Sequence, residues 1–136
     1  MKILLILITV ISEILSMVPT HRVDAAYSCN VNLSGTEVRM QGAIRAQQNY
    51  YFVSGNGLDI YCDGTARWTV DNEAKEVYIE PATGLDEFLT DPESYLGALS
   101  GLEIKNVRYS KPDADLSGYR FDTDSLDSSW VITDLR

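Results

Sequence analysis

The chain has 136 residues and a formal charge of -9, with 11 basic side chains, 20 acidic side chains and a single histidine. Its length fits one domain. The acidic excess argues against a nucleic-acid binder, which needs a basic face to displace counterions from phosphates. Hydrophobic residues make up 45% of the chain and charged residues 23%, a composition typical of a folded domain and not of a disordered one.

The first 25 residues have the three parts of a secretory signal peptide. A basic start at Lys2 precedes an apolar run over residues 3–12, and Val23-Asp24-Ala25 fits a small-residue cleavage site. A helix that spans a membrane needs about 20 apolar residues. The run is shorter than this, so no permanent membrane anchor is expected. We therefore predict an exported protein with a signal peptide over residues 1–25 and one domain over residues 26–136.

Removal of the signal peptide would leave the net charge unchanged but would remove the one histidine. The net charge stays at -9, because Lys2 and Arg22 leave together with Glu13 and Asp24. His21 leaves as well, so the mature chain has no imidazole for metal ligation or for a Ser-His or Cys-His pair. No convincing nucleophile motif is present either, and we expect no enzymatic activity, no metal and no other cofactor.

The two cysteines allow three interpretations. Export implies an oxidising compartment, in which Cys29 and Cys62 could form a disulfide. Alternatively, both are buried thiols that act as small hydrophobic side chains. A lipid anchor at Cys29 is the third interpretation, and the bulky Tyr27 and the polar stretch before it argue against an acylation site.

From Tyr27 onwards apolar residues alternate with polar ones, which is the period of a half-buried strand. Turn residues such as Ser34-Gly35 and Asp63-Gly64 divide the pattern into short segments. Six strands are expected in succession, over residues 27–33, 38–45, 50–53, 58–62, 66–70 and 76–80. Each has one apolar and one polar face, and this predicts an antiparallel sheet with one covered face.

A short helix is expected within residues 84–100 as the cover of that face. Thr90 or Asp91 suits its start and Gly101 its end. Because so short a helix is marginal alone, it must pack on the sheet. Its apolar stripe consists of Tyr95, Leu96 and Leu99. Further strands are expected over residues 102–109, 119–121 and 130–133.

Two groups of carboxylates are candidates for chemical sites. The segment from Asp113 to Asp124 has the side-chain spacing of a calcium loop, but Pro112 and a strand precede it where a helix is usual, so we interpret it as an acidic turn. The carboxylates between Asp59 and Glu80 lie mostly on the polar face of the strands. We interpret them as a solvated acidic surface and not as an acid–base pair.

Residues 62–79 (CDGTARWTVDNEAKEVYI) resemble the hairpin "DG-x-x-x-W-x-x-x-x-x-x-x-EV" of periplasmic outer-membrane lipoprotein carriers, the LolA-like family, in its Bacteroidetes type. Residues 40–52 are similar to the strand pair that precedes this hairpin in the family. Residues 119–136 resemble the closing segment of the same proteins, and the chain looks like a shortened form.

The resemblance implies an α+β, mainly β fold, in which a curved antiparallel sheet forms a half-open barrel with a helical lid on its concave apolar face. Acyl chains of a lipoprotein, or another lipidic ligand, would bind that face in the periplasm. Inner- and outer-membrane lipoprotein-transport proteins would be the partners. The alternative is a non-catalytic periplasmic partner-binding domain that keeps the fold and lacks the cavity. The expected ligand-binding residues are Val38, Met40, Ile44, Phe52, Leu58, Ile60, Trp68, Val70, Val77, Ile79, Leu96 and Leu99.

Overall fold

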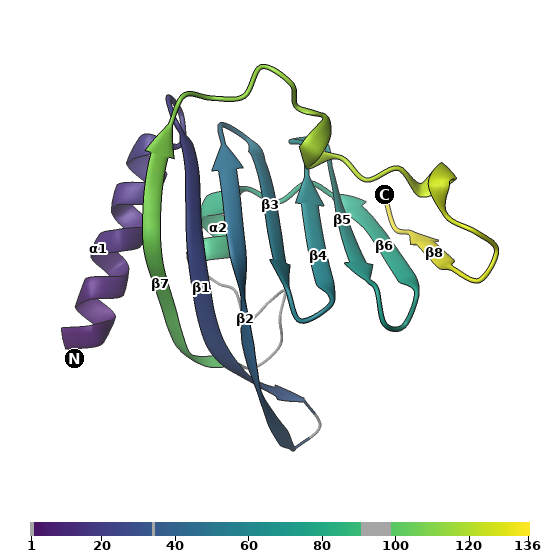
Figure 1. Ribbon diagram of the computed structural model, residues 1–136, viewed down its shortest axis with the longest axis horizontal. Coiled ribbons are helices and arrows are strands. Elements are labelled where there is room, and N and C mark those ends of the chain that lie inside the picture. Colours follow the sequence, from purple (N-terminus) through teal and green to yellow (C-terminus); the bar gives the residue numbers. More distant parts are fainter. Residues whose placement is uncertain (1, 34, 91–98) are drawn as a thin grey trace.

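The computed structural model describes residues 2–33, 35–90 and 99–136, and Figure 1 shows its arrangement. In this part of the chain eight strands form one open sheet with the order β7-β1-β2-β3-β4-β5-β6-β8. All neighbouring strands are antiparallel except β6 and β8, which are parallel. The strands are β1 (Arg22–Leu33), β2 (Thr36–Gln47), β3 (Tyr50–Gly55), β4 (Leu58–Cys62), β5 (Ala66–Asp71), β6 (Glu76–Pro81), β7 (Leu99–Ser110) and β8 (Val131–Asp134). The predicted mainly β fold with a curved sheet is confirmed.

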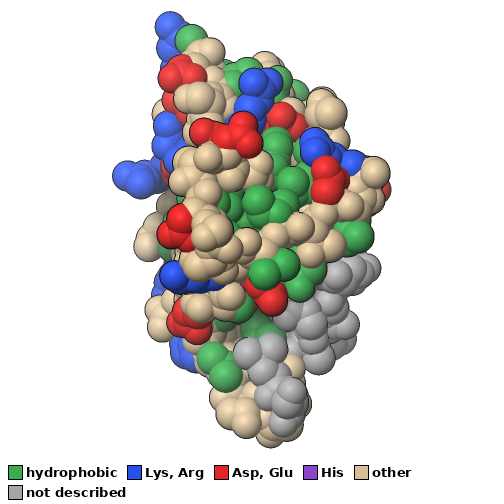
Figure 2. Space-filling view, turned by 90° about the vertical axis from the view of Figure 1, so that its right-hand side faces the viewer, with side chains coloured by type: hydrophobic (Ala, Val, Ile, Leu, Met, Phe, Trp, Pro, Cys, Tyr) green, Lys and Arg blue, Asp and Glu red, His purple; other side chains and the backbone are tan. Residues whose placement is uncertain are grey.

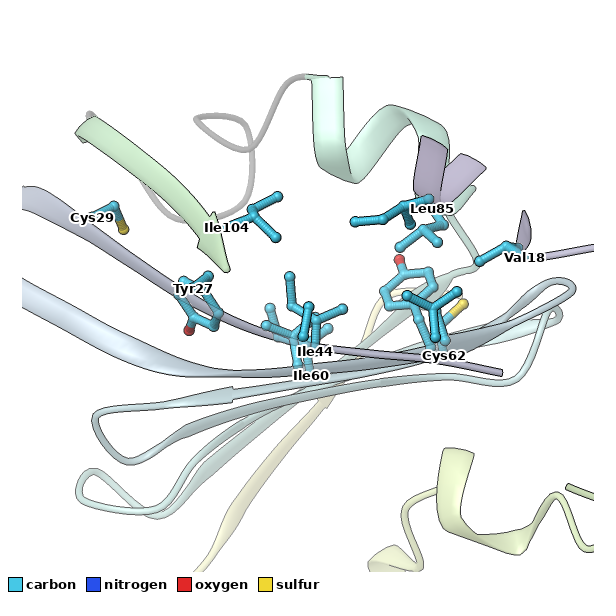
Figure 3. Close-up of a cluster of buried hydrophobic side chains, with 14 of the residues drawn as sticks. Val18, Tyr27, Cys29, Ile44, Ile60, Cys62, Leu85 and Ile104 are labelled. Carbon is cyan, nitrogen blue, oxygen red and sulfur yellow. The ribbon is translucent and has the colours of Figure 1, made fainter. Parts of the chain in front are cut away.

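Two α-helices, α1 (Lys2–Met17) and α2 (Leu85–Thr90), contribute to a core on one side of the sheet, which we call the helix face. Ile14, Val18 and Leu85 are buried there against the strands. Figure 3 shows Leu85 and Val18 above the sheet, with Ile44 and Ile60 pointing up from it. None of the described helices is long and apolar enough to cross a membrane.

The opposite side of the sheet, which we call the tail face, carries a second core. Ala66, Trp68 and Val70 of β5 and Val77 and Ile79 of β6 are buried on it. The C-terminal segment covers these side chains with Phe121, Leu126 and Trp130. Figure 1 shows this segment running from the top of β7 across the upper ends of the strands to the β6 edge of the sheet, where β8 lies. Two short 3₁₀ helices, Ser117–Tyr119 and Thr123–Ser125, stand in it where a strand over residues 119–121 was expected.

The prediction that the sheet has a single apolar face is therefore wrong, because the β4–β5 turn changes which side chains lie on each face. Cys62 pairs with Arg67, not with Ala66 or Trp68. Because side chains alternate with a period of two, this register sends Trp68 to the face opposite Ile60 and Cys62. The apolar side of the sheet thus changes from the helix face on β1–β4 to the tail face on β5 and β6.

Residues 91–98 of the helix expected within residues 84–100 lie outside the described residues, and the described parts on either side differ from the expectation. Leu85 was expected before it, but it is the first residue of α2. Residues 99–101, expected as the helix end, belong to β7, where Leu99 pairs with Val31. Tyr95 and Leu96 lie outside the described residues.

The first strand starts earlier than its alternation predicts. β1 begins at Arg22, and Val23 within it is completely buried, so the segment expected to be a signal peptide supplies both α1 and the first four residues of β1. In the full chain these residues pair with β2 and β7.

The two cysteines are free thiols, so the disulfide, which was one of the three interpretations, is not formed in the structure. Cys29 lies on β1 and Cys62 on β4, with two strands between them. At about 4.8 Å per strand, the Cα atoms of the two cysteines are roughly 14 Å apart. A disulfide can bridge Cα atoms only up to about 7 Å apart. Figure 3 shows the two sulfur atoms at opposite ends of the first core. Burial raises the pKa of both thiols, in accord with the interpretation as small hydrophobic side chains.

Candidate functional site

A groove of about 420 Å³ lies on the helix face, at the end of the sheet that carries the β3–β4 and β5–β6 turns. Its volume falls in the range of small-molecule sites, roughly 300–1,000 Å³. An apolar wall faces a polar rim. The lining residues are Val31, Val38, Met40, Gly55, Asn56, Gly57, Leu58, Asp71 and Glu73.

The apolar wall comes from the four neighbouring strands β1 to β4, which are in register. Val31 of β1 pairs with Val38 of β2, and Leu58 of β4 pairs with Gly55 of β3. Val31 and Met40 are buried, whereas Val38 and Leu58 are half-buried. Gly55 has no side chain, and the Tyr27 hydroxyl lies where a Cβ there would project.

Tyr27 forms one boundary of this region, beside the paired Gly42 and Gly55. A Cβ at Gly55 would collide with the Tyr27 hydroxyl, so only glycine admits the ring. The hydroxyl donates a hydrogen bond of 3.1 Å to the Ser54 carbonyl. Burial raises the pKa of Tyr27 to about 12.

Hydrogen bonds fix the turns that form the rim. Asn56 and Gly57 adopt positive φ angles of 52° and 82°, the conformation of a tight two-residue hairpin turn. The Asn56 Nδ2 donates to the Arg39 carbonyl at 2.8 Å, which ties this turn to β2. The Asn72 Nδ2 donates to the Gly57 carbonyl at 3.0 Å, which ties the β5–β6 turn to the same place.

The rim carries two carboxylates. Asp71 pairs with Leu58 across β4 and β5, so its side chain is on the helix face beside the apolar wall. Its Oδ1 accepts hydrogen bonds from the backbone N–H groups of Glu73 and Ala74, at 3.1 and 2.9 Å. The Glu73 carboxylate lies along Gly57, where a Cβ would be 3.5 Å from Oε1. Both are therefore at the mouth of the groove.

The structure divides ten of the twelve predicted ligand-binding residues between two faces. Val38, Met40 and Leu58 line the groove, and Ile44 and Ile60 lie deeper in the core of the same face. On the tail face are Trp68, Val70, Val77 and Ile79. Phe52 also lies there, beside Tyr61 with 4.7 Å between ring centroids. Leu99 is in β7, and Leu96 is outside the described residues.

Sequence reasoning missed Val31, the Gly55–Gly57 turn and the two carboxylates of the groove. Asp71 and Glu73 were assigned to a solvated acidic surface, because the alternation appeared to continue unbroken from β4 into β5. The signal that could have located them is the length of the Asp63-Gly64 turn, which sets the register.

A separate polar cluster lies on the tail face and joins the two ends of the chain. The Arg22 guanidinium donates to both carboxylate oxygens of Asp113, at 3.0 and 3.1 Å. The side-chain hydrogen bond to Asp24 raises the pKa of Arg22. Asp113 also exchanges two backbone hydrogen bonds with the buried Gln47 amide. The residue that would begin a calcium loop is thus ion-paired, and the described residues contain no cluster of three metal-ligating side chains.

Arg45 is a second side chain on which the C-terminal segment rests. Its Nη2 donates to the Gly118 carbonyl at 2.9 Å. The guanidinium carbon lies 5.0 Å from the ring centroids of both Phe52 and Tyr119, within cation–π range. This contact holds the segment against β2 and β3 and leaves the helix face untouched.

Figure 2 views the molecule from the side on which β8 lies and shows hydrophobic side chains gathered in the centre, with acidic and basic groups around them. The most exposed large hydrophobic side chains in the described part of the chain are at the β6–β8 edge: Tyr78, Val131, Ile132 and Leu135. No protein-family model matches the chain, and no curated protein matches it.

Proposed function

We propose that the groove binds the acyl chains of a lipoprotein, or another lipidic ligand, and that the protein is a non-catalytic periplasmic carrier of such chains. The observation that carries the proposal is the groove itself, about 420 Å³ in volume and walled by Val31, Val38, Met40 and Leu58. The resemblance of residues 62–79 to a hairpin of lipoprotein carriers supports the same function.

The energetics of this wall suit a transient carrier. Burial of an acyl chain yields about 0.8 kcal/mol for each methylene that leaves water. The groove is partly open and carries a polar rim, so a bound chain keeps some contact with water. Incomplete burial lowers the affinity and allows the chain to be released to an acceptor.

The test is a titration of the full chain with a fluorescent acyl probe that has an uncharged head group. Val38→Trp fills the groove and is expected to weaken binding at least about tenfold, equivalent to about 1.4 kcal/mol. Val131→Trp is the matched control, because Val131 is 59% exposed on β8 and does not belong to the groove lining. Absence of saturable binding by the parent chain would refute lipid binding.

Carriage of lipoproteins needs a separate measurement. The full chain is incubated with a purified lipoprotein and with the same lipoprotein stripped of its acyl chains. The proposal predicts a soluble complex with the acylated form only, and weaker complex formation by Val38→Trp. Equal complex formation with both forms would contradict a carrier of acyl chains.

A partner-binding domain is the second candidate, and the exposed β8 edge favours it. β8 is the last strand of the sheet among the described residues. Val131 and Ile132 in this strand and Leu135 just after it are 45–59% exposed. Edge strands with apolar side chains can pair with an extended segment of another protein. This function predicts association that Ile132→Lys abolishes and Val38→Trp leaves unchanged.

A further inference from the structure

The described residues of the polar rim carry negative charge. Resting on the proposed function, we propose that the groove selects amphiphiles with a cationic head group, in which a protonated amine is attached directly to an acyl or alkyl chain. Among the described residues of the lining, Asp71 and Glu73 are the charged ones, and none of these described residues is basic.

The two carboxylates are placed to meet such a head group. Asp71 is directly opposite Leu58 in the sheet, and Glu73 lies along Gly57, the next residue of the rim. A chain lying along Val38, Met40 and Leu58 would therefore bring its head to the carboxylates. A positive head group would form charge-assisted hydrogen bonds there.

Neither carboxylate is neutralised by an ion pair in the part of the chain that the structure describes. The basic side chains nearest in sequence have other partners. Lys75 donates to the Ser129 hydroxyl at 3.3 Å, and Arg67 forms an ion pair with Glu80 at 3.0 Å. The rim thus keeps its negative charge when the groove is empty.

The net charge of the chain acts in the same direction. At a formal charge of -9 the molecule repels a carboxylate or phosphate head group and attracts an ammonium group. Asp71 and Glu73 determine where the ammonium group binds, because their carboxylates lie beside the apolar wall. Both contributions are screened by salt, with a Debye length of about 8 Å at 0.15 M ionic strength.

The test compares three ligands that have the same alkyl chain: dodecylammonium, dodecanol and dodecanoate. Each displaces the uncharged fluorescent acyl probe from the full chain, below the concentration at which the ligand aggregates. Dodecylammonium is expected to bind at least about tenfold more tightly than dodecanoate, with dodecanol between them, and the difference should shrink as salt is added.

Conservative variants test whether Asp71 and Glu73 cause the preference for the ammonium ligand. The double variant Asp71→Asn, Glu73→Gln is expected to bring the ammonium and carboxylate affinities close together while leaving the dodecanol affinity unchanged. Asp71→Asn retains an oxygen that can accept from the Glu73 and Ala74 N–H groups. Glu103→Gln is the control, because Glu103 is an exposed carboxylate on β7, outside the groove lining.

The outcomes separate this inference from the proposed function. If neither the probe nor any of the three ligands binds, the proposed function fails. If probe and dodecanol bind but dodecanoate equals or exceeds dodecylammonium, the lipid site stands and the cationic preference is wrong. A preference that persists in the double variant would also overturn the role of Asp71 and Glu73.

Discussion

Gln47 is a single residue that joins three parts of the chain. Its side chain is 1% exposed at the end of β2. The amide oxygen accepts from the Asp113 N–H at 2.9 Å and the Tyr119 hydroxyl at 3.3 Å, and the amide nitrogen donates to the Asp113 carbonyl at 3.1 Å. Glutamine supplies both the donor and the acceptor that this buried site requires.

Gln47→Leu is expected to destabilise the fold by about 2–4 kcal/mol, because it removes the hydrogen bonds that join this buried side chain to the Asp113 backbone and the Tyr119 hydroxyl. Urea unfolding measures the effect. Gln41→Leu is the matched control on the same face of β2, where the side chain is exposed, and it should change the free energy of unfolding by less than about 0.5 kcal/mol. Equal effects of the two variants would contradict the network.

Tyr27 gives a prediction at high pH. Its pKa rises from 10 when unfolded to about 12 in the fold, because burial disfavours the phenolate. The contribution to stability is fully present below pH 10 and is lost as the pH rises through 12. Tyr27→Phe loses the hydrogen bond to Ser54 but removes this titration.

The free energy of unfolding, measured below pH 10 and between pH 10 and 12, tests this account. Tyr27→Phe is expected to be about 1 kcal/mol less stable below pH 10 and to lose less stability on going to pH 12 than the parent chain. An equally steep alkaline loss in both chains would show that Tyr27 does not carry it.

Among the elements, the β4–β5 turn decides which side chains share a face. It places Trp68 and Ile79 in the second core, opposite the groove. Ile79→Ala is expected to lower the free energy of unfolding by about 2–5 kcal/mol, because Ile79 is 4% exposed. Probe affinity should stay within about twofold under conditions where the variant is folded, since no groove residue is changed.

The matched comparison is Leu58→Ala in the groove wall, which is expected to alter probe affinity directly. Binding that responds to Ile79→Ala and not to Leu58→Ala would place the ligand on the tail face. Chemical denaturation of both variants identifies the conditions under which each is folded, so that a loss of binding is not confused with unfolding.

The strands show how far the sequence could predict the structure. Alternation located β2 to β6 within a few residues, because a one-sided apolar pattern is a local property of each segment. It could not determine whether Trp68 shares a face with Ile60, since that depends on register across a turn. The groove was therefore predicted in part: Val38, Met40 and Leu58 were found, whereas Asp71 and Glu73 were assigned to water.

At the scale of the whole molecule, the sequence and the structure give the N-terminal segment different roles. Its sequence predicts a signal peptide over residues 1–25, and the structure packs Ile14, Val18 and Val23 of the same segment into the first core. Arg22 also binds Asp113 of the C-terminal segment. The first residue of the protein isolated from cells, identified by mass spectrometry, measures whether the segment is kept.

A chain that begins at Ala26 is expected to be less stable than the full chain by several kcal/mol, because each buried aliphatic side chain removed is worth roughly 1.5–3 kcal/mol. It should also bind a dye for exposed apolar surface, since α1 no longer covers the helix face. Unfolding of both chains in urea tests this, and equal stability would show that residues 1–25 add nothing to the fold.

The central claim is that an acyl chain occupies the groove on the helix face. The most direct measurement is a methyl NMR titration of the full chain with an uncharged acyl amphiphile. We predict saturable shifts of the Val31, Val38, Met40 and Leu58 methyl signals, with those of Val70, Val77 and Ile79 unchanged. Shifts confined to the second set, or none at all at saturating ligand, would contradict the account.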